Sequence, residues 1–137
     1  MKVLVMYVRK FSYQTTETSV PEVEFVIEHN SFENAVLAFI QIEEKDEEKD
    51  FANRGKKLAN HIKWTARKNN TRNIILHSFA HLSESKASAS YTQDLLNNCE
   101  ERLRNVAYET TQTPFAHFLD LKIDAPGFSL ARIWADL

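Results

Sequence analysis

Hydrophobic and polar residues follow two different periods along this chain, and each period predicts a different kind of element. Apolar residues recur every three to four positions in Phe51–Lys68 and Ser90–Asn105, which is typical of amphipathic helices. Alternating or continuous apolar stretches predict strands at Lys2–Tyr7, Phe11–Thr18, Val23–Glu28, Ala35–Ile42, Asn73–Leu76, Ala107–Gln112, Phe115–Ile123 and Phe128–Trp134. This order predicts an α+β fold, a curved sheet or partial β-barrel with the two helices packed outside.

Each predicted helix has one apolar stripe that should face the core. The stripe of the first helix contains Phe51, Gly55, Leu58, Ile62 and Ala66, and that of the second contains Tyr91, Leu95, Cys99, Leu103 and Val106. The segment Ser90-Tyr91-Thr92-Gln93 resembles a capping box and would start the second helix. Because Cys99 lies in the middle of its stripe, we expect a buried, unreactive thiol rather than a catalytic one.

The bulk properties of the chain restrict its class. Its 137 residues are the size of one domain, spanning 1–137, with a single core. The formal net charge of -2 gives no overall attraction for nucleic acid, so any RNA contact needs a local basic patch. One cysteine excludes an internal disulfide, and no apolar run is long enough for a signal peptide or a membrane span. We therefore expect a soluble cytoplasmic protein. Two glycines are too few for a Gly-rich phosphate loop.

Two groups of charged residues lie at or near the first predicted helix. The run Glu43–Asp50 is expected to be a solvated loop and the acidic start of the first helix, since it lacks the neutral oxygen ligands and turn glycine of a Ca²⁺ loop. Opposite the apolar stripe of that helix lies a basic group with one aromatic residue, formed by Lys57, Trp64, Arg67 and Lys68. This face has two interpretations: an RNA contact with cations on phosphates, or a subunit interface with solvated lysines.

The segment Asn73–Glu84 is the strongest candidate for a functional site. A short buried strand runs into a loop, and a helix follows, so the loop lies where α/β units usually bind ligands. His77 and His81 suggest a metal pair, but only the distant His117 could be a third ligand, so we expect neither metal nor cofactor. A serine hydrolase is not favoured either, because no glycine stands near a serine at the spacing of a nucleophile elbow.

Three segments of the chain resemble one known family in the same order and spacing. Ser78–Ser83, SFAHLS, resembles the PFAHLS signature of the editing domain at the N-terminus of archaeal threonyl-tRNA synthetases. Thr113–Phe118, TPFAHF, is similar to the APFG of that family followed by two aromatics. Val36–Glu43, VLAFIQIE, is similar to its VLVAFISVE strand. The resemblance covers nearly the whole chain and implies a D-aminoacyl-tRNA deacylase-like fold.

The resemblance also implies an activity and a site. The reaction would be hydrolysis of the ester in a mischarged aminoacyl-tRNA, most simply serine on the threonine tRNA, with a 2′-hydroxyl of the RNA helping to activate water. Backbone N–H groups would stabilise the oxyanion. His81 and Ala80 would be the catalytic positions, with His81 holding substrate or water; the alternative is that His81 caps its own loop. The pocket would be lined by Ser78, Phe79 and Ile42 on one side and by Pro114, Phe115, His117 and Phe118 on the other.

The chain departs from the family at positions that affect this expectation. Leu119 stands where the family carries a lysine, Arg132 where it carries a glutamate, and Ser78 where it often carries proline. Because the chain is short, we expect a freestanding domain that edits in trans, on released tRNA or beside a partner synthetase, and that pairs as a homodimer like its family. Two alternatives remain open: an inactive descendant that binds RNA or a synthetase through the Trp64 face, and a hydrolase for another acyl group, such as a D-amino acid.

Overall fold

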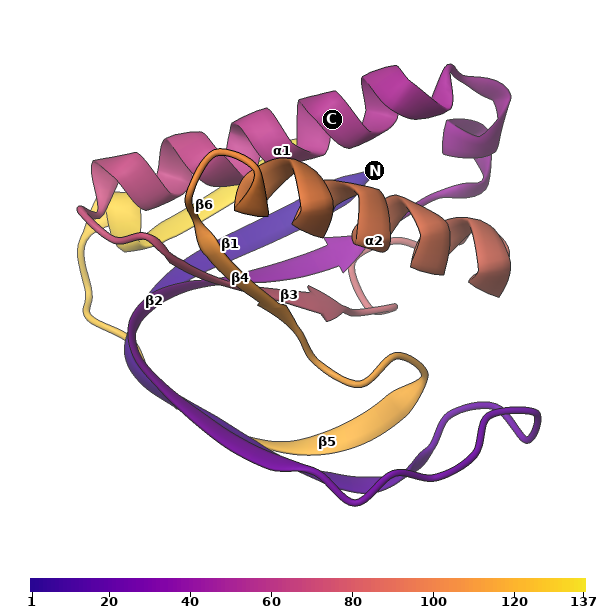
Figure 1. Cartoon of the computed structure of the whole chain (residues 1–137), viewed down its shortest axis with the longest axis horizontal. Helices are drawn as coiled ribbons and strands as arrows, with labels where there is room; N and C mark the ends of the chain where they lie inside the picture. Colours follow the sequence, from indigo (N-terminus) through magenta and orange to yellow (C-terminus); the bar gives the residue numbers. More distant parts are fainter.

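The computed structural model describes every residue, Met1–Leu137, as one curled sheet with two helices packed on it (Figure 1). The helices and strands are, in chain order, β1 (Lys2–Thr18), β2 (His29–Gln41), the 3₁₀ helix η1 (Glu44–Glu48), α1 (Phe51–Lys68), β3 (Asn73–Ser78), α2 (Ala89–Arg104), β4 (Glu109–Gln112), β5 (His117–Asp124), the 3₁₀ helix η2 (Ser129–Ala131) and β6 (Arg132–Asp136). Neither α-helix is long and apolar enough to cross a membrane.

The sheet mixes parallel and antiparallel pairs because only some of its strands are joined through helices. Its order is β4-β3-β2-β1-β5, and β6 also pairs with β1. β2, β3 and β4 are parallel neighbours, and the connections between them are α1 and α2, as parallel pairing requires. β1 is antiparallel to β2, β5 and β6. This architecture confirms the predicted α+β class with a curved sheet and two main helices.

β1 is one continuous strand of 17 residues where the sequence analysis predicted two. Its first part, Lys2–Met6, pairs with β6, and its second part, Lys10–Thr18, pairs with β5, with a register shift between Thr15 and Glu17. Exposed polar residues at its middle, Arg9 and Lys10, suggested a break, but they lie on the strand as it bends. β1 and β2 curl together, which turns the sheet into a half-barrel (Figure 1).

The predicted strand Val23–Glu28 is wrong. This segment is not part of the sheet, and its end is fixed to β1 by hydrogen bonds from the Thr15 N–H to the Glu28 carbonyl at 3.0 Å and from the Glu28 N–H to the Thr15 Oγ1 at 2.9 Å. Ile27 is 86% exposed, so the apolar residues that suggested a strand have no core to cover. The next strand begins at His29.

The core lies on both faces of β2, which explains its continuous apolar sequence. Alternate residues of this strand pack in opposite directions: Val36, Ala38 and Ile40 lie in the cluster with Leu58, Ile62, Leu95 and Cys99 of the helices, whereas Ala35, Leu37 and Phe39 pack with Val8, Phe11 and Tyr13 of β1. A strand buried on both faces reads as an apolar run rather than as an alternation. Residues 35–43 are all buried.

Both helices begin at side-chain caps, although one cap is not the predicted one. Asp50 accepts a hydrogen bond from the Asn53 N–H at the start of α1. α2 begins at Ala89, capped by Ser88, whose Oγ accepts from the Tyr91 N–H at 3.3 Å, so the predicted capping box at Ser90 is wrong. Glu47 accepts hydrogen bonds from the N–H and Oγ of Ser88, which holds the cap two residues earlier than predicted.

Two other predictions about burial need correction. Glu43 and Asp46, expected in a solvated run, are buried and lie 2.7 and 3.2 Å from the Met1 ammonium; Asp46 also pairs with Arg54 at 2.9 Å. Buried carboxylates are tolerated here because cations accompany them. Val106 is 48% exposed because α2 ends at Arg104, before the last position of the predicted stripe.

Candidate active site

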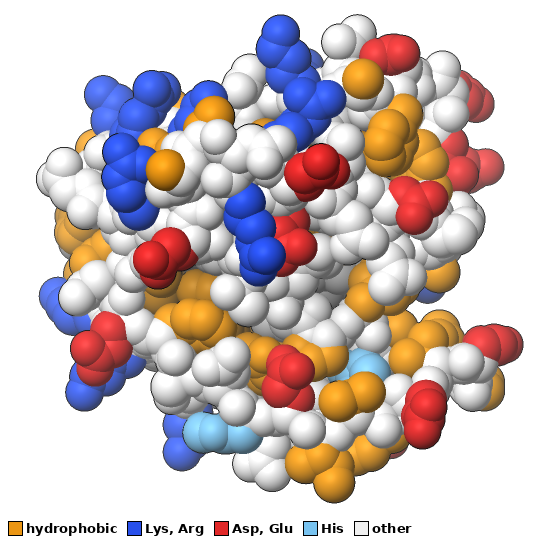
Figure 2. All heavy atoms as spheres, viewed as in Figure 1, with side chains coloured by type: hydrophobic (Ala, Val, Ile, Leu, Met, Phe, Trp, Pro, Cys, Tyr) orange, Lys and Arg blue, Asp and Glu red, His pale blue; other side chains and the backbone are white.

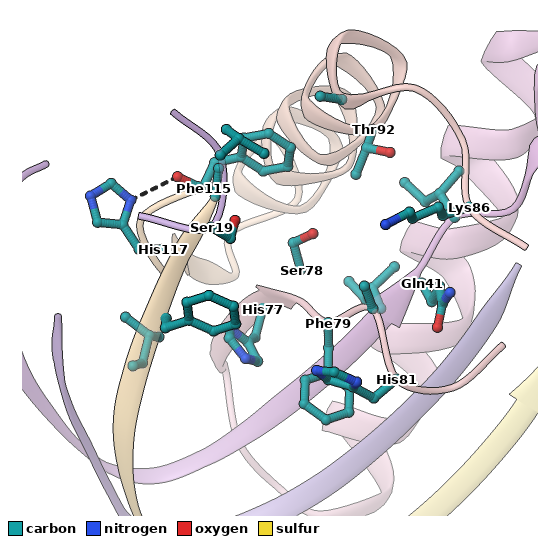
Figure 3. Close-up of a pocket in the computed structure, with 18 of the residues that line it drawn as sticks. Ser19, Gln41, His77, Ser78, Phe79, His81, Lys86, Thr92, Phe115 and His117 are labelled. Atoms are coloured by element: carbon teal, nitrogen blue, oxygen red, sulfur yellow. Dashed lines mark hydrogen bonds between the residues drawn. The ribbon is translucent and has the colours of Figure 1, made fainter. Parts of the chain in front are cut away.

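A cavity of about 400 Å³ lies between the loop after β3, the first turn of α2 and β5. Figure 3 shows Ser78, Phe79, His81, Lys86 and Thr92 around the cavity, and the His117 ring turned away from it. Of the residues predicted to form the site, it is lined by Ile42, Ser78, Phe79, Ala80, His81, Phe115, His117 and Phe118. The structure thus brings together two segments that are more than thirty residues apart in the sequence. Other lining residues, not predicted, include Ser19, Val20, Gln41, His77, Lys86 and Thr92.

The loop after β3 is held in place by the side chain of Gln41, the last residue of β2. Its Oε1 accepts hydrogen bonds from the N–H groups of Leu82 and Ser83 at 2.6 and 2.7 Å. Its Nε2 donates to the carbonyls of Ser83 and Ser85 at 2.7 and 3.0 Å. The Ser83 hydroxyl donates to the Glu43 carboxylate at 2.7 Å. One buried amide therefore pairs with both backbone polar groups of Ser83 and with one each of Leu82 and Ser85.

The tip of this fixed loop has backbone N–H groups that form no hydrogen bond within the protein. The Phe79 N–H is paired with the Ile40 carbonyl at 2.9 Å, but the N–H groups of Ala80 and His81 form no hydrogen bond within the protein. The His81 ring is exposed and packs edge-on against Phe79, with ring centroids 5.0 Å apart, and it has no hydrogen-bond partner. Gln41, rather than His81, holds the loop.

His77 forms part of the cavity floor and is neutral. Its ring is 7% exposed and packs against Phe39 and Phe79, at centroid distances of 5.4 and 5.8 Å. Its Nδ1 is hydrogen-bonded to the Thr113 Oγ1 at 2.9 Å. Burial lowers the pKa of His77 to about 4, because the imidazolium loses its hydration. No group of three or more side chains of the metal-ligand types gathers around His77, His81 or elsewhere.

The opposite wall depends on a left-handed residue. Ala116 has φ of 58°, and its carbonyl accepts a hydrogen bond from the Ser19 N–H at 2.8 Å. His117 then donates from Nδ1 to the Phe115 carbonyl at 2.8 Å and accepts at Nε2 from the Val26 N–H at 3.1 Å. A carbonyl oxygen only accepts, so this pattern places the proton on Nδ1 and leaves no free nitrogen for substrate.

Pro114, predicted in this wall, does not line the cavity. It borders a smaller neighbouring hollow that it shares with Phe115 and His117, because the turn at Phe115 and Ala116 reverses the chain after it. Of the two unusual positions, Leu119 lines the cavity, whereas Arg132 begins β6 and pairs with Met6 outside it. The glutamate position of the family therefore lies away from this cavity.

The residues predicted to bind RNA form a separate surface. Lys57, Trp64, Arg67 and Lys68 are exposed along α1, and none lines the cavity. The Trp64 ring is 38% exposed and lies between neighbours on its own helix: His61 stacks at a centroid distance of 6.3 Å, and the Lys68 Nζ is 6.0 Å from the ring. Lys and Arg side chains gather over this helix in Figure 2.

Of the cavity residues that were not predicted, Gln41 could have been recognised from the sequence, whereas Lys86 and Thr92 could not. Gln41 interrupts an apolar run between Ile40 and Ile42, and a polar residue at such a position indicates a buried hydrogen-bonding role. Lys86 and Thr92 belong to a polar loop and to the start of a helix, and nothing in the local pattern distinguishes them from solvated residues.

Comparisons with known proteins agree with this arrangement. The family model described as the archaea-specific editing domain of threonyl-tRNA synthetase matches residues 1–137. A threonine–tRNA ligase of Staphylothermus marinus is 28% identical over 137 residues, and one of Pyrococcus furiosus is 26% identical over 136 residues. These matches cover 97% of this chain but only 22% of each ligase, so the chain spans about a fifth of the length of these relatives.

A solved structure shares the fold. The c-Myc DNA Unwinding Element Binding Protein superposes with a TM-score of 0.67 at 14% identity, covering 100% of this chain and 99% of that one. At this identity the likeness concerns the fold alone, and it agrees with the predicted α+β fold with a curved sheet. Because the family model matches the whole sequence, the chain belongs to the family of archaea-specific editing domains of threonyl-tRNA synthetase.

Proposed function

We propose that this chain hydrolyses the ester of mischarged aminoacyl-tRNA, with serine on the threonine tRNA as its substrate. The observation that carries the proposal is that one cavity is lined by Phe79, Ala80 and His81 and by Phe115–Phe118, which belong to two of the three segments that resemble the family. The cavity is large enough for an aminoacyl group with part of the terminal nucleotide.

The chemistry of the cavity favours catalysis by positioning. Its lining contains no aspartate or glutamate, so no carboxylate there can act as a general base. The free N–H groups of Ala80 and His81 are suitable donors for the oxyanion that forms when water attacks the ester. Since an adjacent 2′-hydroxyl of the RNA can help to activate water, the protein mainly has to hold the ester and water in place. His81, with both ring nitrogens unused, would hold the water or the substrate.

Such a site corrects an error that the aminoacylation site of a threonyl-tRNA synthetase cannot avoid. Serine lacks only one methyl of threonine, and a pocket distinguishes that difference by about 1–3 kcal/mol. A second site that accepts serine and excludes the larger threonine removes the wrong product.

The test is deacylation of threonine-specific tRNA charged with L-serine, with L-threonine and with a panel of other L- and D-amino acids. The proposal predicts rapid loss of serine and slow loss of threonine. His81→Ala should lower the rate, whereas His29→Ala, at an exposed histidine outside the cavity, should not. Rapid loss of a D-aminoacyl group alone would instead identify a different deacylase, and no loss from folded protein would refute the enzyme proposal.

A second candidate function rests on a different observation. α1 has six basic side chains, Arg54, Lys56, Lys57, Lys63, Arg67 and Lys68, and no acidic one, although the whole chain has a net charge of -2. Arg54 is buried and paired with Asp46, and the other five make the surface of the helix basic. Such a surface favours contact with RNA phosphates or with an acidic surface of a synthetase. If the wild type hydrolyses no ester but loses tRNA binding on Lys57→Glu or Arg67→Glu, the chain is a binding module.

A further inference from the structure

Three polar side chains from three segments converge in the cavity, and no interaction within the protein uses them. Ser78 is the last residue of β3, Lys86 lies in the loop before α2, and Thr92 lies in the first turn of α2. Figure 3 shows the Ser78 hydroxyl and the Lys86 ammonium directed towards one another, with Thr92 lying above the same space. None of the three side chains forms a hydrogen bond or an ion pair with another protein group.

The charge of this space is positive. Lys86 is the one side chain with a permanent charge among the residues that line the cavity, and no carboxylate lines it. Glu47, the acidic residue at the α2 cap, accepts hydrogen bonds from the N–H and Oγ of Ser88 at 3.0 and 3.2 Å. The Lys86 ammonium therefore has no anionic partner within the protein.

The backbone on both sides of Lys86 is fixed. The Ala87 N–H donates to the Ile42 carbonyl at 2.9 Å, and the Ser85 carbonyl accepts from Gln41 at 3.0 Å. The Lys86 side chain thus extends from a backbone whose position is already fixed, so less conformational entropy is lost when its ammonium binds a ligand. One ammonium and two hydroxyls offer only donors to a ligand that carries negatively charged oxygens, and charge-assisted hydrogen bonds of this kind are the strong ones.

We propose that Lys86, Ser78 and Thr92 form a phosphate subsite that binds the phosphodiester of the terminal nucleotide, the phosphate nearest to the ester. The proposal rests on the proposed function for the identity of the substrate. Ser78 directly precedes the Phe79-Ala80-His81 tip, and Lys86 and Thr92 line the same cavity as that tip. A nucleotide with its phosphate at Lys86 would therefore direct its ester towards the loop tip.

The test compares two minimal substrates that differ by one phosphate, 2′(3′)-O-seryl adenosine and its 5′-monophosphate. For the wild type, KM should be about tenfold lower for the phosphorylated substrate, with similar kcat. Lys86→Met should remove this difference between the two substrates, and Lys86→Arg should keep it. Lys122→Met is the matched control, because this exposed lysine on β5 lies outside the cavity. Circular dichroism and the thermal midpoint verify that each variant is folded.

Three results would overturn the proposal. One is an unchanged ratio of KM values in folded Lys86→Met. Another is an equal fall in kcat for both substrates, which would place Lys86 at the ester. The last is a preference for aspartyl over asparaginyl adenosine that Lys86→Met abolishes, which would assign the anion to the acyl group.

A binding measurement separates this proposal from the proposed function. By calorimetry, the wild type should bind adenosine 5′-monophosphate about tenfold more tightly than adenosine, and Lys86→Met should bind both equally. If no ester is hydrolysed but this difference is present, the subsite stands and the deacylase proposal fails. If hydrolysis occurs and the difference is absent, the subsite fails alone.

Discussion

Replacing Gln41 with leucine should destabilise the protein and release the loop that forms one wall of the cavity. The side chain is 3% exposed and makes four hydrogen bonds, two to N–H groups and two to carbonyls of Leu82, Ser83 and Ser85. Leucine has nearly the same size, so the change removes hydrogen bonds rather than volume. At about 0.5–1.5 kcal/mol each, and with water able to reach part of the loop, the expected loss of unfolding free energy is about 2–4 kcal/mol.

Urea unfolding of Gln41→Leu measures this loss, and Gln93→Leu is the control because Gln93 is exposed on α2. Amide hydrogen exchange gives a local readout: the N–H groups of Leu82 and Ser83 should exchange faster in the variant, whereas those of β1 should follow global stability. Deacylation, if present, should fall in parallel. A loss below about 1 kcal/mol, together with unchanged exchange at Leu82 and Ser83, would refute the conclusion that Gln41 holds the loop.

Three further predictions concern other positions. The pKa of His77 is about 4 in the folded protein and 6.5 ordinarily, so on acidification the unfolded chain binds the proton first. The unfolding free energy should therefore fall by about 3 kcal/mol between pH 6.5 and pH 4. His77→Asn should remove this part of the pH dependence, as measured by unfolding at several pH values. Ala116→Gly should raise the thermal midpoint, because φ of 58° costs a residue with a Cβ about 1–2 kcal/mol, partly offset by the greater freedom of glycine when unfolded; an unchanged or lower midpoint would contradict this. Cys99 is fully buried and burial raises the pKa of its thiol to about 12, so a thiol reagent should label it only as fast as the protein opens, and immediate labelling of native protein would count against its place in the core.

The elements that packing alone determines were predictable from the sequence. The run from Ala35 to Ile42 predicts a doubly buried strand, and the stripes of α1 and α2 predict their buried faces, because helix and strand periods directly reflect which side meets the core. The loop at Phe79–Ser83 was predicted as a site because its residues resemble a family signature and follow a strand end.

The remaining features depend on contacts between distant residues. The burial alternation of β1 breaks at its middle, where Arg9 and Lys10 are both exposed, so the local pattern does not show that Lys2–Tyr7 and Phe11–Thr18 are one strand. Glu43 and Asp46 are typical surface residues whose burial requires cations from Met1 and Arg54. The sequence around Lys86 shows only a lysine in a polar loop, and the fold brings it into the same cavity as Ser78 and Thr92.

For the proposed deacylase function, the continuous β1 has a consequence for how acyl selectivity can change. The loop after β3 and the aromatic wall before β5 lie on strands that are separated in the sheet by β2 and β1, so the gap between them follows the curl of those two strands. The register shift between Thr15 and Glu17 lies where β5 begins, beside Phe118. A bulge of this kind sets local twist. A lineage could therefore widen or narrow the cavity, and exchange one amino acid for another as the preferred acyl group, while every residue that touches the substrate stays the same.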